Sequence, residues 1–171
     1  MFEKYDNILV LSGAGFGIDS GLPDYEEMHR MGDEMARQFN IDARVIESPD
    51  FYKQNPKTAW GIKAYIMDMF LTKTPHSGYF KLKELLRDKN HFIVTSNIDD
   101  HFRDAGFDET KLYEIHGRLK ILQCVNRSCN LKHNLWPLKK NSCTRKYDYK
   151  IKNSQMYLLW RLCQTQCLFY R

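Results

Sequence analysis

Apolar runs and turn residues alternate along the chain in a way that predicts strands separated by helices. An apolar run from Asn7 to Leu11 ends in a cluster of glycines, which is typical of a buried parallel strand that leads into a tight turn. Further strands are expected from His91 to Thr95 and from Lys111 to Ile115. Because helical segments separate these strands, the pattern predicts an α/β protein with a mostly parallel sheet and crossover helices.

Helix signals fill the intervals between the expected strands. Helices are expected at residues 32–39, from Ser48-Pro49, from Asn55-Pro56, at residues 76–89 and at residues 100–105. A serine or asparagine before a proline is a typical helix start, and Gly106 is a typical helix end. The helix after Asn55-Pro56 carries an apolar stripe on one face, for which core packing is a sufficient explanation: Ile62, Ile66, Met69 and Phe70.

Composition places this chain of 171 residues among ordinary globular proteins. Its 43% hydrophobic and 27% charged residues include no apolar run of the ~18 residues that a membrane span needs. The amino terminus does not resemble a secretory signal, so a cytoplasmic location is expected. Residues 1–117 hold 14 basic against 20 acidic residues, whereas residues 118–171 hold 12 against 1 and all five cysteines. A basic tail can contact nucleic acid, but we favour the interpretation that this tail is basic for another reason.

Polar side chains and glycines gather where the expected strands end. The turn Gly13-Ala14-Gly15 would let a phosphate approach the backbone, although many tight turns need the same freedom. Asn97 and Asp99 follow the second strand, where they are either ligand-binding residues or helix caps. His116 follows the third strand and is suited to general-base chemistry near neutral pH, although a single histidine is more often structural. A dehydrogenase is disfavoured because no acidic residue ends a strand about 20 residues after the glycines.

Three segments, taken in order, resemble the successive motifs of sirtuins, the NAD-dependent protein deacylases. They are Gly13-Ala14-Gly15 with the run Ser20 to Tyr25, then Thr95 to Asp99, then Glu114 to Gly117. The resemblance covers roughly Ile8 to Cys129. It implies a Rossmann-like fold of sirtuin type that lacks its C-terminal strands.

The resemblance also implies a set of site residues. NAD-binding positions are Gly13, Ala14, Gly15, Asp24, Tyr25, Ser96, Asn97, Ile98 and Asp99, and His116 is the base. In the sirtuin reaction an acyl-lysine carbonyl oxygen displaces nicotinamide, and the histidine then removes a ribose hydroxyl proton, so that NAD is consumed. The protein substrate would be an acylated lysine; an NAD hydrolase, an ADP-ribosyl transferase and a non-catalytic remnant remain alternatives. Gly17, Glu26 and Ser96 differ from the residues common in sirtuins, which are serine, arginine and glutamine.

The C-terminal part departs from the sirtuin pattern. We divide the chain into residues 1–121, an incomplete NAD-binding domain, and residues 122–171, the remnant of a small zinc-binding module. Cys124 and Cys129 are the candidate zinc ligands, although two buried or exposed thiols are an equal alternative. The tail from about Met156 is interpreted as read out of frame. Lost strands would leave an apolar face uncovered, so marginal stability or aggregation is expected.

Overall fold

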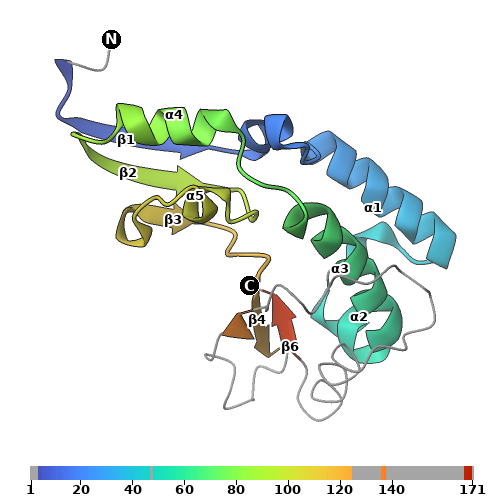
Figure 1. Ribbon diagram of the computed structural model, residues 1–171. Helices are drawn as coiled ribbons and strands as arrows, with labels where there is room; N and C mark the ends of the chain where they lie inside the picture. Colours follow the sequence, from blue (N-terminus) through green and yellow to red (C-terminus); the bar gives the residue numbers. More distant parts are fainter. Residues whose placement is uncertain (1–3, 47, 125–135, 138–167, 171) are drawn as a thin grey trace.

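Three parallel strands form the central sheet of the computed structural model, which describes residues 4–46, 48–124, 136–137 and 168–170. The strands are β1 (Asn7–Ser12), β2 (Asn90–Thr95) and β3 (Leu112–Glu114), side by side in the order β1-β2-β3 (Figure 1). The predicted parallel α/β sheet is therefore confirmed.

Helices occupy most of the sequence between these strands. They are α1 (Tyr25–Phe39), α2 (Pro49–Gln54), α3 (Pro56–Leu71), α4 (Ser77–Leu85) and α5 (His101–Asp104), with short 3-10 helices η2 (Ala14–Ser20), η3 (Ala43–Val45) and η4 (Glu109–Lys111). The hydroxyl of Ser48 caps α2 by accepting from the Phe51 amide, as the sequence predicted. Helix α1 begins at Tyr25 rather than at residue 32, because the Asp24 carboxylate caps it.

One face of the sheet packs against α4 and α5 (Figure 1). Alternate residues of each strand point to this face because side chains alternate along a strand. The buried residues of the core between this face and the helices are Tyr79, Leu86, Ile93, Phe102, Ala105, Phe107 and Leu112. A second core lies among α1, α2 and α3, and it includes two residues from the loops that follow the strands, the half-buried Ile98 and the buried Leu119.

The opposite face of the sheet exposes apolar side chains. Leu9 is 63% exposed and Leu11 is 72% exposed, and both lie on β1. The strand register places Leu9 beside Phe92 of β2, and Tyr113 of β3 is exposed as well. A row of apolar side chains on a sheet is a surface that other apolar groups bind. This exposed face agrees with the expectation that part of the sheet lacks cover.

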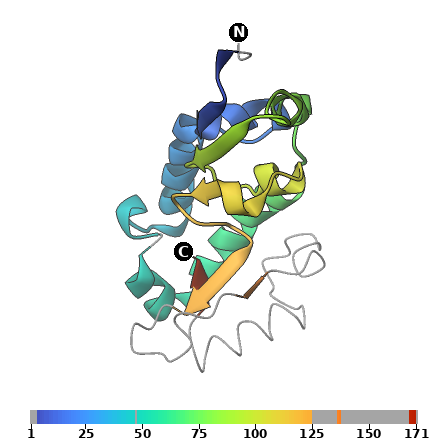
Figure 2. The ribbon, with the colours of Figure 1, turned by 90° about the vertical axis from the view of Figure 1, so that its left-hand side faces the viewer.

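A second, smaller sheet follows the parallel one in the chain. It contains β4 (Ile121–Cys124), β5 (Trp136–Pro137) and β6 (Leu168–Tyr170), which pair antiparallel in the order β5-β4-β6. In Figure 2, β4 (orange) lies outside the three parallel strands. Among the described residues, no helix is long and apolar enough to span a membrane.

Candidate functional site

The three candidate motifs meet at one edge of the parallel sheet. The register places Ser12 beside Thr95 and Thr95 beside Glu114, so each motif begins at the same level of its strand. The Ser12 hydroxyl donates to the Thr95 hydroxyl across 2.8 Å, and the Ile115 amide donates to the Thr95 carbonyl across 3.0 Å. Ligands of open α/β sheets bind at this carboxyl edge.

The glycine turn after β1 approaches the loop after β2 closely. A Cβ added at Gly13 would lie 3.3 Å from the Ser96 hydroxyl, so these two motifs are in contact. Gly15 differs, because it is exposed and a Cβ there would meet none of the described atoms within 4 Å. Neither packing nor a positive φ therefore requires glycine at position 15. Open space beside a bare backbone is what a bound phosphate needs.

Asn97 and Asp99 are buried in the loop after β2. The Asn97 backbone amide donates to the Thr95 hydroxyl across 3.0 Å, while its buried side-chain amide nitrogen has no partner of good hydrogen-bond geometry among the described residues. The Asp99 carboxylate accepts from the His101 amide across 2.8 Å at the start of α5. The capping role considered from the sequence is thus present for Asp99.

Asp99 also lies beside the glycine turn. A Cβ on Gly17 would come within 3.4 Å of the second Asp99 oxygen and within 3.1 Å of the Leu22 side chain. The glycine at position 17 is therefore part of the close packing between η2 and this loop. Burial raises the pKa of the Asp99 carboxyl above its ordinary value.

A buried group of aromatic and imidazole side chains beneath the loop was missed by the sequence analysis. Tyr79 is fully buried, and its ring meets the rings of Phe16 on η2 and His101 on α5. Burial raises the pKa of Tyr79 and lowers that of His101. Periodicity marks Tyr79 only as a core residue, so no sequence signal places it beside Asp99.

His76 anchors the glycine turn to α4. Its Nδ1 accepts from the Gly78 amide, so Nε2 carries the proton and donates to the Phe16 carbonyl across 2.8 Å. Its backbone amide donates to the Ser20 hydroxyl across 3.0 Å. The sequence predicted His76 as the first residue of this helix, whereas in the structure it is the cap directly before Ser77.

The remaining candidates have mixed placements. His116 is exposed on the turn after β3, and Gly117 beside it has φ +72°, a conformation that glycine adopts without strain. Asp24 caps α1, and Tyr25 is 72% exposed with its ring edge against His29.

Only one of the two candidate zinc ligands falls within the described residues. Cys124 ends β4, and Cys129 lies outside the described residues. Among the described residues, no group of three or more His, Cys, Asp or Glu side chains is arranged to hold a metal ion. The out-of-frame interpretation of the tail from Met156 likewise concerns residues almost all outside this range.

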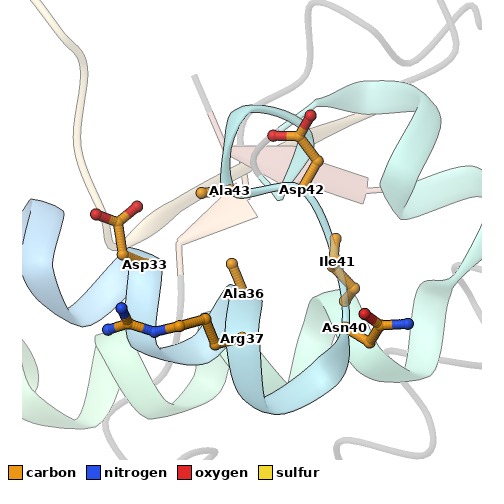
Figure 3. Close-up of a pocket in the computed structure, with 7 residues that line it drawn as sticks. All are labelled: Asp33, Ala36, Arg37, Asn40, Ile41, Asp42 and Ala43. Atoms are coloured by element: carbon orange, nitrogen blue, oxygen red, sulfur yellow. The ribbon is translucent and has the colours of Figure 1, made fainter.

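A surface hollow of about 500 Å³ lies elsewhere, beside the C-terminal half of α1 and η3 (Figure 3). Its lining residues are Asp33, Ala36, Arg37, Asn40, Ile41, Asp42 and Ala43. Helix α1 leads from the glycine turn toward this hollow. Because a helix rises about 1.5 Å per residue, its length separates the hollow from the turn. The hollow is therefore remote from the edge where the motifs meet.

A parallel sheet with its glycine turn and polar loops at the carboxyl edge defines a Rossmann-like α/β protein. The family model described as the Sir2 family matches residues 13–164. The chain belongs to the Sir2 family. The match continues past Cys129, where the sequence analysis ended the resemblance, and so corrects that boundary.

Similar proteins are identical to this chain at about a third of the aligned positions. An NAD-dependent protein deacylase of Leptospira interrogans is 33% identical over 125 residues, which cover 72% of this chain and 48% of that protein. NAD-dependent protein deacylase 2 of Pseudomonas aeruginosa is 30% identical over 128 residues, which cover 74% of this chain and 49% of that protein. The chain thus spans about half the length of these relatives.

Solved structures show the same fold. A Sir2 homologue in complex with NAD superposes with a TM-score of 0.58 at 23% identity, covering 82% of this chain and 52% of that one. Sir2 bound to acetylated peptide gives a TM-score of 0.53 at 21% identity, covering 76% and 46%.

Proposed function

We propose that this chain acts as an NAD-dependent protein-lysine deacylase, which transfers an acyl group to ADP-ribose and releases nicotinamide. The observation that carries the proposal is the aligned row of Ser12, Thr95 and Glu114, which brings all three motifs to one sheet edge. The names of the relatives, and the Sir2 structures bound to NAD or acetylated peptide, support this reaction class.

The described residues fit a dinucleotide at this edge. Open space at Gly15 leaves room for a phosphate, and the buried side-chain amide nitrogen of Asn97, which has no partner of good geometry among the described residues, can donate a hydrogen bond to a polar ligand. Bound NAD would supply the ribose that accepts the acyl group. Residues in contact with it would be Gly13, Ala14, Gly15, Asp24, Tyr25, Ser96, Asn97, Ile98 and Asp99.

His116 would act as the general base. It follows β3 at the same edge, and a neutral imidazole nitrogen there would accept a proton from a ribose hydroxyl. General-base catalysis contributes about 10²- to 10⁴-fold to a rate, so loss of the imidazole has a measurable effect even in a slow enzyme.

Nicotinamide release from NAD tests this proposal, with and without an acetyl-lysine peptide. The purified chain is compared with His116→Ala and with the matched control His91→Ala, since His91 lies near the start of β2, at the opposite end of the sheet. We expect release that needs the peptide, falls at least about 100-fold in His116→Ala and is kept in His91→Ala.

The other outcomes contradict the proposal in different ways. Release without peptide would indicate an NAD hydrolase or an ADP-ribosyl transferase. Equal loss in both histidine variants would indicate general destabilisation rather than loss of a base. Absence of release, together with no binding of ADP-ribose by calorimetry, would indicate a non-catalytic remnant.

We also propose that residues 122–171 form a separate small module, in which Cys124 and Cys129 contribute to a zinc site, within a cytoplasmic protein. The separate antiparallel sheet around β4 supports this division. Bound zinc measured by elemental analysis should fall in Cys124→Ser, and an unchanged metal content would refute the assignment.

A further inference from the structure

Asp100 combines two features that local structure does not explain. Its φ of +64° is a left-handed conformation, which costs a non-glycine residue energy although aspartate tolerates it better than most. Its side chain is only 1% exposed, yet it does not cap α5, because Asp99 accepts from the His101 amide instead. A strained backbone and a buried charge together require partners elsewhere.

Those partners come from the segment that follows His116. Arg118 Nε donates to Asp100 Oδ1 across 2.5 Å, and Lys120 Nζ lies 3.5 Å from Asp100 Oδ2. Between these two cations, the amide of Leu119 donates to the carbonyl of Ile98 across 3.0 Å. Three consecutive residues of one segment therefore hold the loop after β2.

The ion pairs around Asp100 also reach Glu114, on the other side of the His116 turn. Arg103 on α5 donates from Nε and Nη2 to Glu114 across 3.0 and 2.9 Å, and its Nε lies 3.9 Å from Asp100. Arg118 Nε also lies 3.8 Å from Glu114. Glu114 and Arg118 flank His116, so both ends of its turn are fixed to one set of charges.

We propose that Asp100 is a positioning residue that clamps the His116 turn against the loop bearing Asn97 and Asp99. The contacts that form this clamp lie within the chain and do not depend on the proposed function. Only the expected effect on turnover rests on that function. The buried Leu119 side chain, 2% exposed in the core of the helices, supports the same attachment.

An ordinary structural ion pair is the competing explanation, since removal of one partner of a buried pair destabilises a protein in any case. Two substitutions separate the explanations. Asp100→Asn removes the charge and keeps the size, whereas Asp100→Gly removes the charge and relieves the positive φ. The matched control is Asp104→Asn, because Asp104 also pairs with Lys120, across 2.8 Å, but is 43% exposed on α5.

Amide hydrogen exchange measures the clamp without any need for activity. In Asp100→Asn we expect exchange at Leu119 to rise about tenfold relative to Ile93 in the sheet, with no such change in Asp104→Asn. Asp100→Gly should be more stable than Asp100→Asn, yet exchange at Leu119 should stay fast. Parallel acceleration at Leu119 and Ile93, or no change at Leu119, would overturn the clamp.

Turnover adds a second readout, which a merely structural role would not move in the same way. In both Asp100 variants we expect kcat for nicotinamide release per folded molecule, with the folded fraction measured by circular dichroism, to fall at least about fivefold, with KM for NAD within about twofold. A merely structural role would lower the apparent kcat only in proportion to the loss of folded protein and would leave kcat per folded molecule unchanged, which would overturn the catalytic part of the proposal. If the wild-type chain releases no nicotinamide, the proposed function fails, while exchange at Leu119 still decides the clamp.

Discussion

The two faces of the sheet should respond differently to the loss of a phenylalanine. Phe102 is 2% exposed, and its ring lies 5.0 Å from that of Tyr79 and 5.2 Å from that of Phe107. Phe102→Ala would leave a cavity that these rings cannot refill, at a cost of about 3–5 kcal/mol in the free energy of unfolding. Phe92, on the uncovered face, is 42% exposed.

The cost of Phe92→Ala should be only the lost transfer free energy of the buried part of the ring. No cavity cost is added, because the space left behind opens to solvent. Full burial of a phenylalanine stabilises by about 1.5–3 kcal/mol, so slightly more than half of that, about 1–2 kcal/mol, should be lost.

Urea unfolding followed by circular dichroism measures both variants. A difference of about 2 kcal/mol corresponds to midpoints about 1 M apart at a typical m-value. Equal losses within about 0.5 kcal/mol would refute the reasoning, since they would mean that both rings are equally enclosed in solution.

Three further predictions follow from single residues. Leu11→Lys should change the free energy of unfolding by less than about 0.5 kcal/mol and raise the monomer fraction in light scattering; unchanged aggregation would show that the apolar face is not its cause. Burial lowers the pKa of His101, so its stabilising contribution is complete above the unfolded-state pKa of about 6.5 and is lost as the pH falls toward the folded pKa. His101→Gln should therefore reduce the loss of unfolding free energy between about pH 7.5 and pH 5.5. Asp99 acts in the opposite direction, because its raised pKa adds stability as the pH falls. Asp24→Ala and Ser48→Ala each remove a helix cap and should each cost about 1 kcal/mol, but only Asp24→Ala should weaken ADP-ribose binding, and equal binding would remove Asp24 from the site.

Local patterns were sufficient to predict the elements that carry strong local signals. The strand from Asn7 and the strand ending at Thr95 are apolar runs bounded by turn residues, and both occur as expected. Helix α1 began earlier than predicted because its first turn is acidic and exposed, which hides its periodicity. The signal that marks its start is Asp24 followed three residues later by Glu27, the spacing of a capping box.

Tertiary contacts decided how the site residues meet. The sequence predicted that Gly13, Asn97 and His116 follow strands, because the end of a strand can be recognised locally. The register that aligns Ser12, Thr95 and Glu114 is a property of strand pairing.

The sequence by itself determined the class of fold, which depends on periodicity, and it carried the resemblance to the Sir2 motifs, which depends on short runs of particular residues. Only the tertiary structure showed that Asp100 lies buried under Arg118 and Lys120, because its charge, its positive φ and its partners belong to segments with no fixed spacing. The same holds for the uncovered face of the sheet. The continuous apolar run of β1 predicts a strand that is covered on both faces, and only the neighbours in space show that Leu9 and Leu11 are exposed.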